Sequence, residues 1–167
     1  TQHKQALVLV PEIGLTPQLL SRLQARLPVP VHVLHSNLND TERAHAWAAM
    51  ASGRGRVLLG TRSAVFTPLP EAGLLIVDEE HDGSYKQQDG FHYHARDVAV
   101  VRAKALNVPM VLGSATPSLE TLHNALTGRY FRHRILQRAG TAQPPTIQIA
   151  DVRKIRLHHG MGQTLLE

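Results

Sequence analysis

The chain has 167 residues, of which 43% are hydrophobic and 19% charged, and this composition is typical of a globular protein with one substantial core. Its net charge of +5 favours a polyanionic partner such as nucleic acid. The absence of cysteine excludes disulfide bonds and thiolate zinc sites, and no apolar run approaches the roughly 20 residues of a membrane span, so we expect a cytoplasmic protein without membrane contact.

Short apolar runs alternate with helical patterns along the first 126 residues. Each run is too short for a core helix and predicts a strand buried on both faces. The predicted strands span residues 6–10, 29–34, 57–59, 74–77 and 108–112. The helical patterns begin at Pro17, after Asn39, near Arg96 and at Ser118. This alternation predicts an α/β fold with a mainly parallel sheet and helices on both faces.

Three of the predicted helices carry recognisable start signals or an apolar face. Thr16 before Pro17 is typical of an N-cap followed by a first-turn proline, and Asn39 with Glu42 resembles a capping box. The helix that ends at Leu106 is expected to bury one apolar face. The residues of this face are Val98, Val101, Ala105 and Leu106.

The acids Asp78, Glu79 and Glu80 follow the strand at residues 74–77 directly. Charged carboxylates are costly in a dry interior, so we expect them at the carboxyl end of the strand, facing a crevice. Such a cluster suits Mg²⁺ held through water and substrate phosphates, and it offers a base to activate water. Alternatively, the acids only open a helix, where the macrodipole favours negative charge.

Three other predicted strands also end in polar loops. These loops are Pro11–Gly14, Gly60–Ser63 and Gly113–Pro117. If the strands are parallel, all four loops converge on one edge of the sheet. The small residues and Arg62 of the second loop favour a phosphate-facing role, although a plain turn with a surface arginine fits equally.

Residues 82–94 combine three of the chain's seven Phe, Tyr and Trp residues with Lys86 and Gln87. Tyr85, Phe91 and Tyr93 form a pattern typical of single-stranded nucleic acid binding, where bases stack on aromatic faces. The alternative is that the rings anchor a long loop onto the core.

Four long motifs, VPEIGLTPQ, GTRSAVF, DEEHDGSYKQQ with HARD, and GSATPSLET, occur in this order. Together they resemble the first helicase lobe of the PriA family of replication-restart helicases, which belongs to helicase superfamily two. The resemblance implies a RecA-like three-layer αβα domain over residues 1–140. Residues 141–167 would then be a connector or the start of the next element.

The resemblance also implies roles for the loop residues. Asp78 would hold the Mg²⁺ of bound ATP through water, Glu79 would polarise the attacking water, and His81 would link this site to Ser114 and Thr116, which couple hydrolysis to DNA movement. The residues implied in DNA binding are Pro11, Gly14, Thr16, Thr61, Arg62, Ser63, Tyr85, Lys86, Gln87, Phe91 and Tyr93.

By resemblance, the chain is part of an ATP-dependent 3′ to 5′ DNA helicase that acts in replication fork restart and primosome assembly. Its implied partners are single-stranded and forked DNA, single-stranded-DNA-binding protein and primosome components, at the bacterial nucleoid. No G-x-x-x-x-G-K-[ST] phosphate loop occurs in the 167 residues, so we expect them not to hydrolyse ATP alone. That loop is expected upstream, and the second lobe with its zinc-binding insertion downstream.

Two other functions remain open. The chain could be a non-catalytic module that binds nucleic acid or a partner protein. It could also belong to another superfamily-two motor, such as an RNA helicase or a restriction translocase, because acid-acid-x-His boxes are shared widely.

Overall fold

The computed structural model describes residues 3–136, 147, 149, 151, 153 and 159–162. The chain divides into two compact units, Thr1–Tyr130 and Phe131–Glu167. In the second unit, residues 131–136 are exposed and form no helix or strand, and Arg153 pairs with Asp151 at 2.7 Å. The predicted domain boundary at residue 140 lies outside the described residues.

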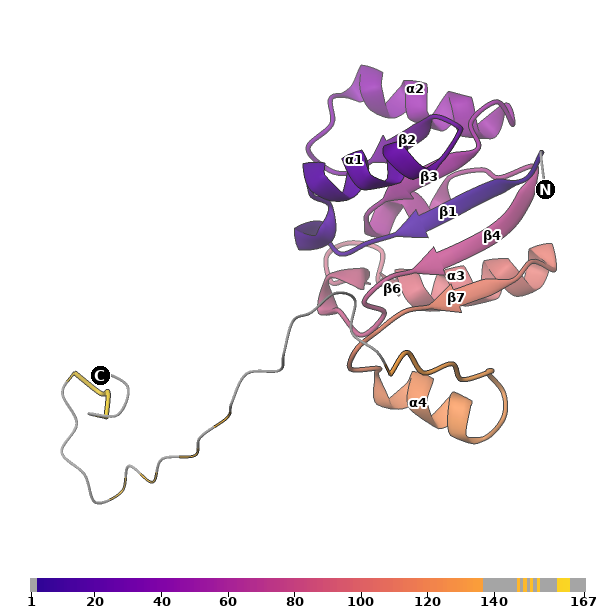
Figure 1. Cartoon of the computed structure of the whole chain (residues 1–167). Helices are drawn as coiled ribbons and strands as arrows, with labels where there is room; N and C mark the ends of the chain where they lie inside the picture. The colour runs from indigo at the N-terminus through magenta and orange to yellow at the C-terminus, as the bar shows by residue number, and fades with distance from the viewer. Residues whose placement is uncertain are drawn as a thin grey trace. The chain divides into compact units, whose positions relative to one another are not determined.

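The first unit is built on a parallel sheet of five strands (Figure 1). The strands are β1 (Gln5–Leu9), β2 (Val31–Leu34), β3 (Val57–Gly60), β4 (Ala72–Val77) and β7 (Met110–Leu112). Their order across the sheet is β2-β3-β1-β4-β7, and every neighbouring pair is parallel. The parallel α/β fold predicted from the alternation of runs is therefore confirmed.

Four α-helices and several short elements connect these strands. The helices are α1 (Pro17–Arg26), α2 (Asp40–Ala51), α3 (Ala95–Leu106) and α4 (Leu119–Leu126). The short elements are the 3₁₀ helices η1 (Glu12–Gly14), η2 (Arg62–Phe66) and η3 (Gly83–Tyr85), and the antiparallel strands β5 (Lys86–Gln87) and β6 (Tyr93–His94).

The predicted helix starts are confirmed by their hydrogen bonds. The Thr16 hydroxyl accepts from the Leu19 N–H at 3.2 Å, and Asn39 and Glu42 exchange the two bonds of a capping box at 2.9 and 3.0 Å. Each such cap stabilises its helix by about 1 kcal/mol. These caps fix where α1 and α2 begin relative to the loops that precede them.

Helices cover both faces of the sheet. Successive residues of β1 point to opposite faces, so Leu7 and Leu9 lie in one apolar cluster, whereas Val8 and Val10 belong to the other. The first cluster packs against α2 and α3, and the second packs against the leucines of α1. This arrangement gives the three layers that the RecA-like resemblance implies.

The predicted buried face of α3 is wrong. The residues that the helix buries are Ala95, Ala99 and Ala103, whereas Val101 is 68% exposed. Alanines at every fourth position form one narrow stripe, and their small side chains let the helix backbone lie close to the sheet. Of the residues expected inside, only Val98 packs against the core.

The register of the sheet aligns the last residues of all five strands. Leu34 pairs with Gly60, Gly60 with Leu9, Leu9 with Val77, and Val77 with Leu112. The five following loops therefore start from a single row, and the predicted convergence of polar loops at one edge is confirmed.

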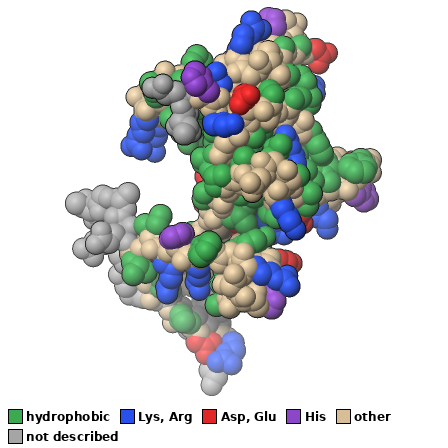
Figure 2. Space-filling view, turned by 90° about the vertical axis from the view of Figure 1, so that its right-hand side faces the viewer, with side chains coloured by type: hydrophobic (Ala, Val, Ile, Leu, Met, Phe, Trp, Pro, Cys, Tyr) green, Lys and Arg blue, Asp and Glu red, His purple; other side chains and the backbone are tan. Residues whose placement is uncertain are grey.

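No helix in the described part of the chain is long and apolar enough to cross a membrane. Figure 2 shows one face of the molecule, on which Lys and Arg side chains are scattered among hydrophobic and neutral ones and form no single basic patch. The positive net charge therefore does not by itself locate a nucleic-acid surface on that face.

Candidate active site and nucleic-acid surface

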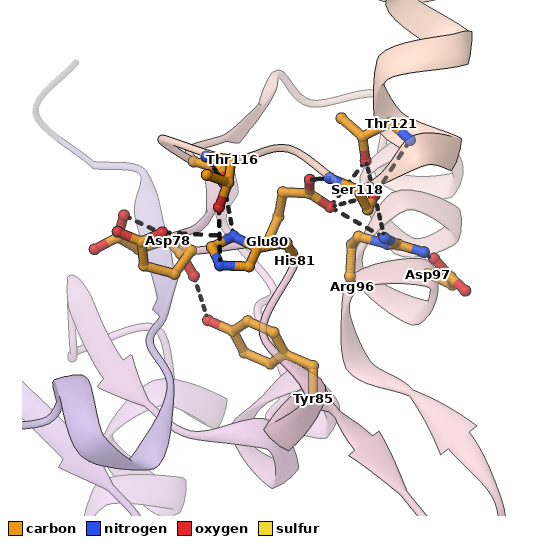
Figure 3. Close-up of polar contacts among 11 residues, drawn as sticks. Asp78, Glu80, His81, Tyr85, Arg96, Asp97, Thr116, Ser118 and Thr121 are labelled. Carbon is orange, nitrogen blue, oxygen red and sulfur yellow. Dashed lines mark hydrogen bonds and ion pairs between the residues drawn. The ribbon is translucent and has the colours of Figure 1, made fainter. Parts of the chain in front are cut away.

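A turn that contains Asp78 and Glu79 follows β4 directly, and Figure 3 shows Asp78 in it. The Asp78 N–H donates to the Leu9 carbonyl at 2.9 Å, and the Asp78 carboxylate accepts the Glu79 N–H at 3.1 Å. Glu79 has a φ of +45°, a conformation that costs a non-glycine residue free energy. Strain of this kind concentrates at functional sites, which makes Glu79 a candidate functional residue.

His81 joins the turn after β4 to the loop after β7. Its Nδ1 lies 2.7 Å from the Ser114 hydroxyl, and its Nε2 lies 3.3 Å from the Thr116 hydroxyl. The same Nδ1 is 3.5 Å from the Glu79 carboxylate. The three residues that the resemblance linked are thus brought together, and Glu79 lies beside them.

Glu80 was expected to face a crevice together with Asp78 and Glu79, but this prediction is wrong because the structure buries Glu80 fully. Its carboxylate accepts the Ser118 N–H at 2.7 Å, the Thr121 hydroxyl at 2.9 Å and an Arg96 N–H at 3.0 Å. It therefore ties the acidic turn to the start of α3 and the start of α4 (Figure 3). No pattern in the sequence indicates these contacts, because Arg96 and Ser118 lie 16 and 38 residues further along the chain.

Burial acts to raise the pKa of Glu80, but the hydrogen bonds from Ser118, Thr121 and Arg96 outweigh it and leave the pKa below its ordinary value. Glu80 is therefore a charged, structural carboxylate rather than a proton donor. Asp78 and Glu79, which lie nearer the surface, are the two acids of the box that remain available for chemistry.

Tyr85 is the one aromatic side chain of the 82–94 segment that is fully buried, so the prediction that it stacks on a base is wrong. Its ring packs in the main core, and its hydroxyl donates to the Asp78 carbonyl at 2.7 Å. Burial and the nearby carboxylates of Asp78, Asp82 and Glu79 raise the pKa of Tyr85, so the phenol keeps its proton and donates. Tyr85 anchors the loop beneath the acidic turn.

The remaining predicted residues of this segment lie in the β5–β6 hairpin. Lys86 is exposed, and the Gln87 side chain donates to the Asp89 carbonyl at 2.6 Å. Phe91 is 79% exposed and stacks on the half-buried Tyr93, with ring centroids 6.2 Å apart. The hairpin therefore presents one exposed ring supported by a second.

The loop after β3 faces this hairpin. Arg62 donates to the carbonyls of Ser84 and Lys86 at 3.0 and 3.1 Å, so its guanidinium holds the hairpin base. Thr61 is buried, whereas Ser63 is exposed. Gly60 is required at the strand end, because a Cβ there would lie 2.3 Å from the Ala64 Cβ.

The loop after β1 lies beside these residues. Pro11 is buried, Gly14 closes η1 by donating to the Pro11 carbonyl at 2.9 Å, and Thr16 is the cap of α1. A cavity of about 150 Å³ joins this loop to the end of β2 and to Thr61. Pro11, Gly14 and Thr16 were predicted to contact DNA. In the structure, the buried Pro11 side chain and the Thr16 hydroxyl that caps α1 help to form the loop itself.

Within the described residues, no three His, Asp or Glu side chains lie close enough to form a metal site by themselves. Mg²⁺ is usually bound through one or two carboxylates together with water and substrate phosphates. The exposed carboxylate of Asp78, at the strand end, fits that mode of binding.

Comparisons with known proteins identify the family. The DEAD/DEAH box helicase profile matches residues 1–125. The chain is 48% identical to "Replication restart protein PriA" of Haemophilus influenzae over 98% of its length, and 47% and 41% identical to proteins of that name from Chlamydia pneumoniae and Bacillus subtilis over 90%.

The chain spans 22%, 20% and 19%, respectively, of the lengths of these three relatives. The resemblance to PriA, inferred above from four motifs, is confirmed by these identities along almost the whole chain. The acidic turn, His81 and the loop after β7 all lie inside the matched region. The chain therefore belongs to the DEAD/DEAH box helicase family.

Proposed function

We propose that this chain is part of an ATP-dependent 3′ to 5′ DNA helicase that restarts replication forks and assembles the primosome, and that it contributes the acidic turn of the ATP site. The observation that carries the proposal is the contact of His81 with both Ser114 and Thr116, since it joins the acidic turn to a second loop at the same edge. The similarity to replication restart proteins supports the choice of DNA over RNA.

The acidic turn supplies the chemistry. Asp78 would hold, through water, the Mg²⁺ that neutralises the phosphate charge of bound ATP. Glu79 orients the attacking water and accepts its proton as the water oxygen bonds to the γ-phosphorus and the bond to the bridging oxygen of ADP breaks. The nearby His81, whose Nδ1 lies 3.5 Å from this carboxylate, can help to orient it.

The coupling runs through His81. A change in position of Glu79 during hydrolysis alters the hydrogen bonds of His81 with Ser114 and Thr116, and thereby moves the loop after β7. The same acidic segment is joined to the β5–β6 hairpin, because Tyr85 supports the Asp78 carbonyl from below. The turn that takes part in hydrolysis is therefore also in contact with the segment that carries the hairpin.

The DNA strand would lie along the edge where the loops converge. Phe91 offers an exposed face for a base, Tyr93 supports it, and Lys86 and Ser63 lie at the surface for phosphate oxygens. The residues that shape this path are Pro11, Gly14, Thr16, Thr61, Arg62 and Gln87. Forked DNA, single-stranded-DNA-binding protein and primosome components, at the bacterial nucleoid, are the partners that fit such an enzyme.

Substitution of Glu79 tests the proposal. In the full-length protein, Glu79→Gln should lower ATP turnover by about a hundredfold or more, because general base catalysis contributes on that order, while nucleotide binding is retained. The matched control is Glu71→Gln, which removes an exposed carboxylate whose one ion-pair partner among the described residues is Lys4 at 3.3 Å. Wild-type ATP turnover in Glu79→Gln would show that Glu79 does not take part in the reaction, and it would refute the proposal.

A further inference from the structure

A second aromatic site lies beside the predicted DNA surface. A cavity of about 460 Å³ opens between α2 and η2 at the end of β2. It is lined by Leu34, by Asp40, Arg43, Ala44 and Trp47 of α2, and by Ser63 and Phe66 of η2. Only Ser63 among these was a candidate residue, so the cavity adds a new element to the surface.

The walls of the cavity are aromatic and accessible. Trp47 is 42% exposed and Phe66 is 45% exposed, so both rings remain partly accessible to a ligand in the cavity. The Phe66 ring meets Tyr93 edge to face, with centroids 4.9 Å apart, and Tyr93 stacks on Phe91. Aromatic contacts therefore run from Phe66 of η2 to the hairpin, and Trp47 of α2 lines the same cavity as Phe66.

The rim of the cavity is polar and carries a cation. Arg43 is half-exposed and lies 3.6 Å from the fully exposed Asp40, a separation at which an ion pair in water is weak. A phosphate oxygen can compete for this guanidinium through charge-assisted hydrogen bonds. Ser63 lines the cavity from η2 and adds an exposed hydroxyl.

We propose that this cavity binds one unpaired base of a DNA strand, stacked on Trp47 or Phe66, with the adjacent phosphate at Arg43. The volume lies within the range of small-ligand pockets, and a base has a π-face that stacks on any aromatic ring. The continuity of rings with Phe91 and the cation on the rim favour a nucleic-acid strand over a peptide. The inference rests on the proposed function and extends its DNA path to α2.

Trp47 is the only tryptophan of the chain, so its fluorescence reports on the cavity directly. The experiment titrates the 167-residue chain with a labelled thymidine oligonucleotide and follows the anisotropy of the label together with Trp47 emission and its quenching by acrylamide. We expect saturable changes in both signals with matching midpoints, and protection of Trp47 from acrylamide. A duplex of the same length should produce a much smaller Trp47 response.

Two variants locate the contact. Phe66→Ala should weaken binding about tenfold, in the range found when a stacking ring is removed. The matched control, Phe131→Ala, removes a 98% exposed ring of the second unit and should leave the affinity unchanged.

Three outcomes would overturn the inference. The first is no strand binding by the wild-type chain. The second is binding in which Trp47 does not respond and Phe66→Ala has no effect. The third is a Trp47 response to an acidic peptide but not to DNA. The proposed ATP hydrolysis is judged separately by Glu79→Gln, so either proposal can fail without the other.

Discussion

The buried pair of Glu80 and Arg96 gives the sharpest stability prediction. The Glu80 side chain is fully buried and that of Arg96 is 12% exposed, with 3.0 Å between the charged atoms. Arg96→Met keeps the bulk of the side chain but leaves a buried carboxylate without its cation, a change that typically costs about 3–5 kcal/mol. Because Ser118 and Thr121 still donate to Glu80, we expect a loss near the lower end, about 3 kcal/mol.

The assay is urea unfolding followed by Trp47 fluorescence. The matched control is Arg43→Met, which breaks the exposed pair with Asp40 and should change the free energy of unfolding by less than about 1 kcal/mol. The double variant Glu80→Gln with Arg96→Met should recover part of the loss, because it removes the buried charge. If Arg96→Met and Arg43→Met lowered the free energy of unfolding equally, the conclusion that Glu80 is a buried charged group stabilised by Arg96 would be refuted.

Three further predictions follow from the same structure. Hydrogen bonds lower the pKa of Glu80, so its contribution to stability is fully present above the ordinary pKa of 4.5 and is lost as the pH falls through the lowered value. In urea titrations below pH 4.5, the difference in unfolding free energy between Arg96→Met and wild type should therefore shrink. Tyr85→Phe removes the donor to the Asp78 carbonyl and should cost about 1–2 kcal/mol in thermal unfolding; an unchanged melting temperature would contradict this role. Gly60→Ala should destabilise by more than about 2 kcal/mol because the new Cβ meets Ala64 and the Leu34 carbonyl, whereas Gly83→Ala, with nothing within 4 Å, should change stability by less than about 0.5 kcal/mol.

The fold could be predicted because its signals are local. Continuous apolar runs specify strands buried on both faces, and Thr16 and Asn39 mark helix starts through bonds to residues three positions away. The alternation of strands and helices then implies parallel pairing, and parallel pairing implies that the polar loops meet at one edge. The strand order β2-β3-β1-β4-β7 was not predictable in this way, because neighbours such as β1 and β4 are far apart in the chain.

The candidate site was predicted in part for the same reason. The placement of Asp78, His81, Ser114 and Thr116 follows from the strand ends, and the structure brings His81, Ser114 and Thr116 into contact. The different roles of neighbouring residues could not be predicted from the sequence. Glu79 and Glu80 are adjacent and chemically identical, yet one is half-exposed and the other is fully buried against Arg96.

Long-range contacts decided the remaining cases. Tyr85 and Phe91 lie in the same aromatic loop, but only Phe91 presents its ring to solvent, because Tyr85 finds a carbonyl acceptor beneath the acidic turn. Arg62 was predicted to face phosphate, and the structure shows it donating to the hairpin backbone. No pattern within a few residues of Tyr85 or Arg62 encodes these partners.

The most direct test of the proposed coupling compares ATP turnover with the unwinding of forked DNA in the full-length protein. The variant to compare with wild type is Ser114→Ala with Thr116→Ala, which removes both hydroxyl partners of His81 and leaves the Asp78 and Glu79 carboxylates in place. The account predicts that turnover falls little while unwinding per ATP hydrolysed falls about tenfold or more, since tenfold corresponds to the loss of about one hydrogen bond's free energy. Unwinding and turnover that fall in the same proportion, or that both remain at the wild-type level, would contradict it.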